Sequence, residues 1–95
     1  MGINQGLRSP ASLHNAGVDE TTAGRWPQAE RLFGEAIQAD PEQAMSWIAR
    51  GLSRGQQGDE AKAAQDLLYA ADLLDRQGAP EQSEQLRQAV SKLQA

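Results

Sequence analysis

Small and apolar residues recur along this chain at an interval of 34 residues. Five pairs of identical or similar residues share that separation: Gly17 and Gly51, Gly24 and Gly58, Ala29 and Ala63, Phe33 and Leu67, and Ala36 and Ala70. Self-similarity at a fixed period is typical of repeat architectures, in which each unit buries its apolar face against the next. The interval therefore predicts two copies of one structural unit.

Helical signals fill both copies and the segment after them. Apolar residues such as Ala29, Leu32 and Phe33 recur three and four positions apart, and no segment alternates apolar and polar residues as a strand would. Ser9 and Asp40 precede prolines and are good N-terminal caps, and glycines stand where helices could end. We expect an all-α chain of about five helices, at residues 10–23, 26–39, 41–56, 59–77 and 80–94, after a flexible segment at 1–9.

A period of 34 residues in helix pairs resembles the tetratricopeptide repeat. The matching positions are Leu13, Gly17, Gly24, Ala29, Phe33, Ala36 and Pro41 in the first copy, and Trp47, Gly51, Gly58, Ala63, Leu67 and Ala70 in the second. The resemblance implies one domain at residues 10–95, with repeats at about 10–43 and 44–77 and a capping helix at about 80–94. It also implies that antiparallel helix pairs stack as a short right-handed superhelix.

Four positions depart from the family pattern. Ala16 and Arg50 stand where leucine is typical, and Glu20 and Arg54 stand where tyrosine is typical. These changes thin the core between the paired helices. Glu20 and Arg54 are equivalent positions on successive first helices and could form an ion pair, although an exposed pair contributes only about 0–1 kcal/mol.

The stretch Gly-Leu-Ser-Arg-Gly at residues 51–55 has the spacing found around the nucleophilic serine of many hydrolases. Such a nucleophile needs a strained strand-to-helix turn, a histidine and an acid, whereas Ser53 falls inside a predicted helix with no strand nearby. The repeat gives Gly51 another purpose, because a small residue there lets the second helix pack closely. We therefore predict that Ser53 is an unreactive, solvated helix residue; a hydrolase that uses Ser53 is the weaker alternative.

Composition narrows the classes of function. The chain carries 9 positive and 13 negative side chains and has a pI near 4.8, which argues against binding to nucleic acid. It has no cysteine, its one histidine is His14 without an apparent catalytic partner, and its carboxylates do not stand at metal-ligand spacing. No apolar run approaches the ~20 residues of a membrane span. We expect a cytoplasmic protein with no membrane insertion, metal or cofactor.

The resemblance assigns partner binding to the inner surface formed by the first helix of each repeat. The residues implied there are His14, Asn15, Val18 and Thr21 from the first repeat, and Met45, Ile48, Ala49, Leu52 and Gly55 from the second. In helix 41–56 this surface carries Met45, Ile48 and Leu52, which lie opposite the side that packs within the repeat. The helix is therefore apolar on two faces, and the second face needs a partner.

Three occupants fit this second apolar face: another part of the chain, a second copy of the chain, or a segment of another protein. Many relatives bind a partner's C-terminal carboxylates with lysine and asparagine, but His14, Val18 and Ala49 stand at those positions, so that ligand is not implied. The predicted function is a non-catalytic protein–protein interaction module, an adaptor, scaffold or assembly factor, that binds an apolar or amphipathic segment. A homodimerising structural module is the alternative.

Overall fold

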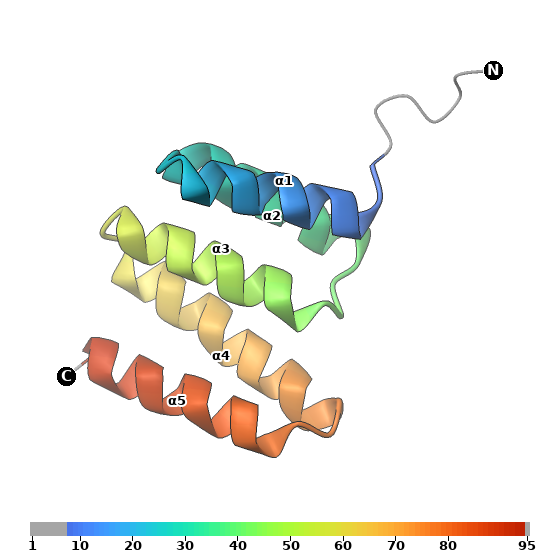
Figure 1. Cartoon of the computed structure of the whole chain (residues 1–95). Coiled ribbons are helices and arrows are strands. Elements are labelled where there is room, and N and C mark those ends of the chain that lie inside the picture. Colours follow the sequence, from blue (N-terminus) through green and yellow to red (C-terminus); the bar gives the residue numbers. More distant parts are fainter. Residues whose placement is uncertain (1–7, 95) are drawn as a thin grey trace.

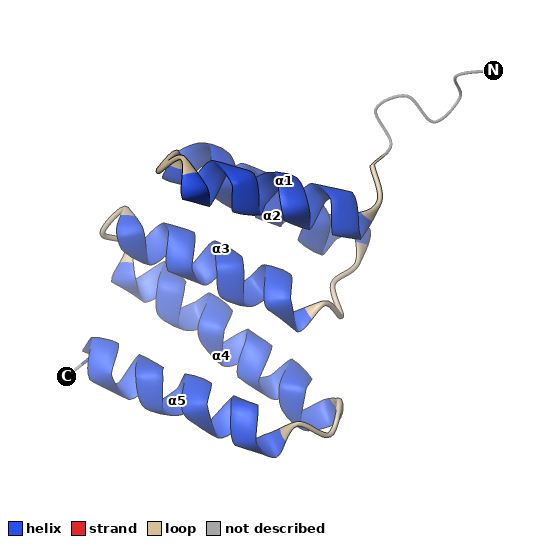
Figure 2. Cartoon of the chain, in the orientation of Figure 1, coloured by secondary structure: helices blue, strands red, loops and turns tan. Residues whose placement is uncertain are grey.

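Helices account for the regular structure of residues 8–94, the part of the chain that the computed structural model describes. Five helices and no strand are present in that range, and short turns join them (Figure 2). They are α1 (Pro10–Thr22), α2 (Trp26–Ala39), α3 (Ala44–Gln56), α4 (Glu60–Arg76) and α5 (Pro80–Gln94). The predicted all-α class is confirmed. Most of the segment predicted to be flexible, residues 1–7, lies outside the described residues.

Local capping and turn chemistry set most of the helix boundaries. The Ser9 hydroxyl accepts a hydrogen bond from the Ser12 N–H at 3.0 Å at the start of α1, and Asp59 accepts one from the Lys62 N–H at 3.1 Å at the start of α4. Three turn glycines adopt the left-handed conformation that other residues avoid: Gly24, Gly58 and Gly78, with φ of 75°, 86° and 83°. These boundaries agree with the sequence to within one residue.

The start of α3 is the exception, because the prediction that this helix begins at residue 41 is wrong. Asp40 does not cap α3; its backbone N–H ends α2 by donating to the Ala36 carbonyl at 2.9 Å. Its carboxylate accepts from the Glu42 N–H at 3.1 Å, which shapes a turn before α3 begins at Ala44. Trp47 Nε1 then donates to the Pro41 carbonyl at 2.9 Å and holds this turn against α3.

The helices form two layers (Figure 1). Helices α1, α3 and α5 lie in front, and α2 and α4 lie behind them. Each helix packs against the next one along the chain, whereas α1 and α3 touch only slightly. Two consecutive helix pairs followed by one further helix make this an all-α, helical repeat-like fold, and they leave the front helices separated from one another.

Small residues bring the helices of each pair together. A Cβ atom placed on Gly17 would lie 2.5 Å from Phe33 Cε1, and one on Gly51 would lie 3.1 Å from both the Ala63 carbonyl oxygen and Asp66 Cβ. Side chains larger than hydrogen do not fit at either position without movement of the neighbours. The predicted role of Gly51 in close helix packing is confirmed.

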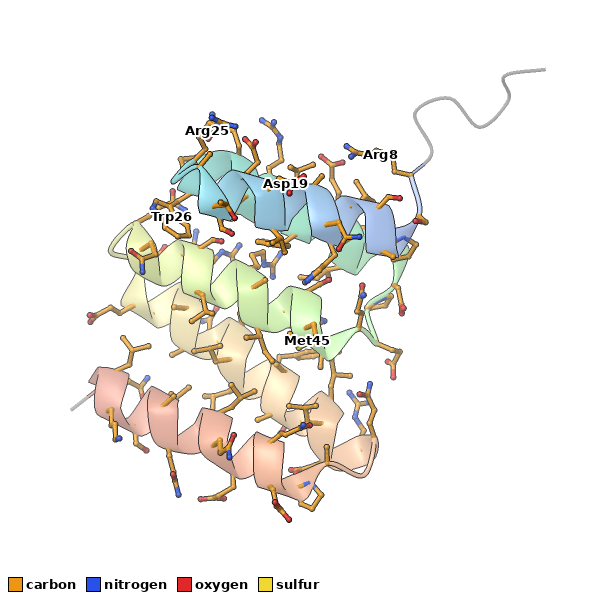
Figure 3. The ribbon with its side chains drawn as sticks, viewed as in Figure 1. Arg8, Asp19, Arg25, Trp26 and Met45 are labelled. Atoms are coloured by element: carbon orange, nitrogen blue, oxygen red, sulfur yellow. The ribbon has the colours of Figure 1, made fainter. Side chains whose placement is uncertain are left out.

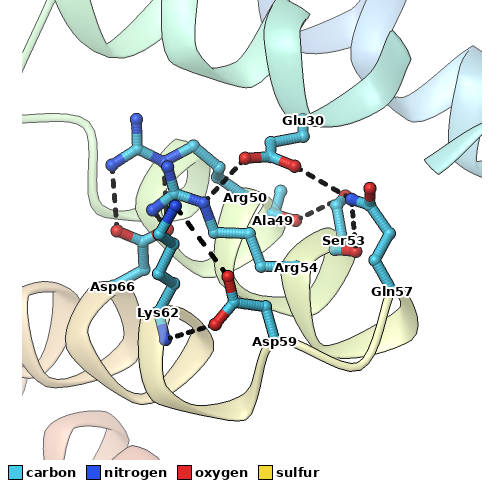
Figure 4. A network of polar contacts seen from close by, with 9 residues as sticks. All are labelled: Glu30, Ala49, Arg50, Ser53, Arg54, Gln57, Asp59, Lys62 and Asp66. Atoms are coloured by element: carbon cyan, nitrogen blue, oxygen red, sulfur yellow. Dashed lines mark hydrogen bonds and ion pairs between the residues drawn. The ribbon is translucent and has the colours of Figure 1, made fainter. Parts of the chain in front are cut away.

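An ion-pair network centred on the buried Asp66 joins α2, α3 and α4 (Figure 4). The Asp66 carboxylate on α4 accepts two hydrogen bonds of 2.9 Å from Arg50 and one of 3.0 Å from Arg54, both on α3. Arg54 Nε also donates to Glu30 on α2 at 2.9 Å. The Arg50 guanidinium lies over the Trp47 ring, 5.1 Å from its centroid. Arg50 and Arg54 therefore place charged side chains between α3 and its neighbours α2 and α4.

The predicted ion pair between Glu20 and Arg54 is wrong. Glu20 instead accepts two hydrogen bonds of 2.9 Å from Arg25, which lies in the turn between α1 and α2. Arg54 instead donates hydrogen bonds to Glu30 at 2.9 Å and to Asp66 at 3.0 Å. Equivalent positions on successive first helices predicted the pair, but Arg25 satisfies Glu20, and Glu30 and Asp66 satisfy Arg54.

Helix α5 covers the outer side of α4. Val90 packs against Ala64 and Leu67 in a small apolar cluster, and Ile48 of α3 reaches the same cluster. Arg87 adds ion pairs to two aspartates of α4, at 3.0 Å from Asp72 and 2.8 Å from Asp75. The last helix therefore supplies apolar and ionic contacts to the second pair.

Two helical glycines provide a test of the close packing. We expect Gly17→Ala to destabilise the protein by roughly 1–3 kcal/mol, since the new methyl group would collide with the buried Phe33 ring. Gly34→Ala is the matched control, because a Cβ there would meet only Arg50 Nη1 at 3.6 Å. That change should stabilise the protein by about 0.5–1 kcal/mol through helix propensity. Urea unfolding curves give both values, and equal effects would contradict the packing argument.

The ion-pair network can be tested by removing its central charge. Asp66→Asn keeps the shape of the side chain but leaves Arg50 and Arg54 without their shared counter-charge, so we expect a loss of roughly 2–4 kcal/mol in the free energy of unfolding. Asp59→Asn is the control, because Asn caps a helix as well as Asp does and the Lys62 pair at 3.9 Å is exposed. Similar losses in the two variants would show that Asp66 has no special role.

Candidate partner-binding face

Large apolar side chains remain exposed on the front of the molecule. Val18 of α1 is 42% exposed, and Met45 and Leu52 of α3 are 59% and 56% exposed. The opposite side of α3 is buried, with Ala44 and Gly51 facing inward. Helix α3 therefore has two apolar faces, as the sequence predicts; on the second face Ile48 packs against the cluster around Val90, whereas Met45 and Leu52 stay exposed.

The first of two hollows on this surface lies between α1 and α3. Its volume is about 310 Å³, and we call it the first hollow. Its lining combines exposed apolar side chains, the half-buried Trp26, the fully buried Phe33 and three polar residues. The lining residues are Val18, Thr21, Trp26, Phe33, Ala49, Leu52, Ser53 and Gln56.

The second hollow lies between α3 and α5 and has a volume of about 280 Å³. Met45 and Ile48 of α3 face Leu86 of α5 across it, and Leu74 of α4 adds to its apolar wall. Gln82 and Gln85 on α5 complete its lining. Figure 3 shows Trp26 and Met45 near opposite ends of α3, so the two hollows lie diagonally across this helix.

The structure divides the predicted binding residues between these hollows. Val18, Ala49 and Leu52 line the first hollow, and Met45 and Ile48 line the second. Thr21, also placed on this surface by the resemblance, lines the first hollow. The remaining predicted residues, His14, Asn15 and Gly55, line neither hollow. Asn15 is exposed on α1, and Gly55 lies close to Ala63 of α4.

Several lining residues were missed by reasoning from the sequence, most notably Trp26 and Leu86. The 34-residue interval could have found Leu86, because it follows Leu52 by the same distance that separates Leu52 from Val18. No comparable signal marks Trp26, whose place beside the first hollow depends on the turn at Gly24.

His14 lies in the seam between α1 and α3. Its Nδ1 is 3.0 Å from the Ser46 hydroxyl, which donates its own hydrogen to Gln43 Oε1 at 3.1 Å. A hydroxyl has one hydrogen, so His14 is the donor to Ser46. The imidazole also packs on Phe33, with the ring centroids 5.2 Å apart. Partial burial lowers the pKa of His14 below its usual value.

Ser53 is fully buried, so the expectation of a solvated serine is wrong. Its hydroxyl donates to the Ala49 carbonyl within α3 at 2.9 Å. The one histidine of the chain bonds to Ser46 instead, so no base accepts the Ser53 proton in the described structure. Ser53 lies inside a regular helix, as predicted, and not at a strand-to-helix turn.

A scan against models of known protein families found no match, and a search of curated proteins found no relative. The resemblance to the tetratricopeptide repeat therefore remains a prediction that rests on the quoted residues. Within residues 8–94, no helix has both the length and the apolar character needed to cross a bilayer.

The lowered pKa of His14 predicts a pH-dependent stability. The unfolded chain binds this proton near pH ~6.5, whereas the folded protein binds it only at lower pH. The contribution of neutral His14 to the free energy of unfolding should therefore be fully present above about pH 6.5. It should decrease as the pH drops toward the folded-state pKa. Hydrogen bonds from Arg25 and Ser83 lower the pKa values of Glu20 and Asp75, respectively, so these carboxylates titrate below that range.

Urea unfolding of the wild type and of His14→Gln at about pH 7.5 and pH 5.5 measures this dependence. We expect the wild type to lose more stability than the variant between the two values, because the variant has no imidazole to protonate. Parallel losses in both proteins would mean that His14 is not the responsible group.

Proposed function

We propose that this chain is a non-catalytic protein–protein interaction module, an adaptor, scaffold or assembly factor, that binds an apolar segment of another protein through its front face. The observation that carries the proposal is the exposure of Val18, Met45 and Leu52 beside two hollows. Contiguous exposed apolar surface is a common mark of an interaction site. The resemblance to the tetratricopeptide repeat adds support, since helical repeats commonly bind partners on this surface.

The character of the lining residues favours an uncharged ligand. Every residue that lines either hollow is neutral, and the polar ones are serine, threonine and glutamine. A charged ligand would lose hydration there without gaining a charged partner. Apolar burial is therefore the main driving force, and a net charge of −4 makes nucleic acid an unsuitable ligand. We place this activity in the cytoplasm, a location with which a chain that lacks cysteine is compatible.

Substitution on the front face tests the proposal. The wild-type chain is used to capture a partner, the bound segment is mapped, and its affinity is measured by fluorescence anisotropy. We expect Leu52→Glu to weaken binding roughly tenfold or more, because burial of one leucine contributes about 1.5–3 kcal/mol. Gln65→Glu, an exposed change on α4, is the control with the same added charge and should have little effect. Circular dichroism should report an unchanged helical fold for both variants.

Salt separates apolar from ionic binding. Raising the salt concentration to about 1 M, where the Debye length is ~3 Å, should change the affinity little. An affinity that collapses with salt and survives Leu52→Glu would place the binding site on the charged outer surface instead. If sedimentation shows a wild-type dimer and a monomeric Leu52→Glu variant, the front face serves self-association.

A further inference from the structure

We propose that Met45 is a redox-sensitive position of the front face, at which a peroxide converts the thioether to a sulfoxide and thereby weakens the binding of an apolar ligand in the second hollow. This inference rests on the proposed function and adds a means of regulating it. Three observations carry it: the exposure of Met45, its place in the lining of the second hollow, and the aliphatic character of its neighbours there.

Met45 carries the only sulfur atom within residues 8–94, because the chain has no cysteine and its other methionine is Met1. The residue is 59% exposed, the highest value among the exposed large apolar residues of this range. Peroxides oxidise an accessible thioether readily, whereas they leave aliphatic side chains unchanged. In the lining of the second hollow the reaction is therefore confined to Met45, since the other apolar residues there, Ile48, Leu74 and Leu86, are aliphatic.

The step is a two-electron oxidation of sulfur by oxygen transfer. The Sδ lone pair attacks one oxygen of hydrogen peroxide, an S–O bond forms and the O–O bond breaks. The second oxygen keeps its hydrogen, takes up the hydrogen of the first oxygen and leaves as water. Reversal requires a dithiol reductant, with which methionine sulfoxide reductases remove the oxygen as water while the dithiol becomes a disulfide. Met45 can therefore alternate between an apolar and a polar form.

The sulfoxide changes binding more than it changes the fold. In the free protein Met45 is more than half exposed, so water hydrates the new S–O group. A ligand that covers the second hollow displaces that water, and the aliphatic neighbours provide no hydrogen-bond donor in its place. The amides of Gln82 and Gln85 are the side-chain donors in this lining, and they limit the expected loss of affinity to severalfold.

Hydrogen peroxide and mass spectrometry test the reaction at Met45 on the full chain. Trypsin places Met1 and Met45 in separate peptides, residues 1–8 and 32–50, so each sulfoxide is measured on its own. We expect the oxidation rate of Met45 in the folded protein to lie within about threefold of its rate in the same chain unfolded in urea. Urea unfolding of the oxidised protein should give an unchanged midpoint. A slower reaction in the folded protein, or a lowered midpoint, would overturn the inference.

The effect on binding is measured by NMR with N-acetyl-leucinamide, an uncharged model of one apolar residue. Shifts of the Leu86 amide signal report the second hollow, and shifts of the Val18 amide signal report the first. We expect peroxide treatment to weaken binding severalfold at Leu86 only, and reductase with dithiothreitol to restore it. Met45→Leu is the matched control, because leucine has a similar volume but is not oxidised, so its binding should not respond to peroxide.

Three results would contradict the role of Met45 in binding: no probe binding at Leu86 in the wild type, unchanged binding there after oxidation, or an equal loss in Met45→Leu. The proposed function is judged separately, by capture of the natural partner. If Leu52→Glu still weakens that capture, the proposed function survives these results; if capture is unaffected, the proposed function fails.

Discussion

The carboxylate of Asp66 is the point on which the orientation of α3 depends. It is almost completely buried and is satisfied by three hydrogen bonds from two arginines of α3. A buried carboxylate is tolerable only with such complete pairing, so α3 can take few positions relative to α4. Through Arg54 and Glu30 the same network reaches α2. The three helices are thereby fixed together by directional contacts that an alanine-rich core does not provide.

The fixed position of α3 determines what the front face can do. With its arginines and Gly51 turned toward α4, the side that carries Met45 and Leu52 is left exposed. Glycine and alanine allow close approach within each helix pair, whereas α1 and α3 touch only slightly. The two hollows arise from this contrast between tight pairs and separated front helices. The same feature that stabilises the pairs therefore creates the surface to which we assign partner binding.

Much of the fold could be predicted because its determinants are local. Caps at Ser9 and Asp59 and the left-handed turn glycines set most boundaries through contacts a few residues apart. The exception, the start of α3, arose because Asp40 can either cap a helix or shape a turn, and the contact of Trp47 with the Pro41 carbonyl favours the turn. Both outcomes have the same local signal, so the sequence alone did not separate them.

The polar interior and the shape of the candidate binding surface depend on contacts between distant residues. Nothing local marks Asp66 as buried, because its partners lie on another helix, and the burial of Ser53 follows from the way α3 packs. Of the residues that line the two hollows, register anticipated Val18, Thr21, Met45, Ile48, Ala49 and Leu52 and missed the others. Its division into two hollows was not, since that depends on the distances between α1, α3 and α5.

The placement of large and small side chains connects stability with the proposed function. The core relies on alanine at many buried positions, while Met45 and Leu52 are more than half exposed. Each buried leucine contributes about 1.5–3 kcal/mol, so a chain arranged for stability alone would bury these side chains. A ligand that covers them adds this missing apolar burial to the folded state only. Its binding therefore raises the free energy of unfolding by RT ln(1 + [L]/Kd). Under the proposed function, the partner completes an apolar core that the chain alone leaves incomplete.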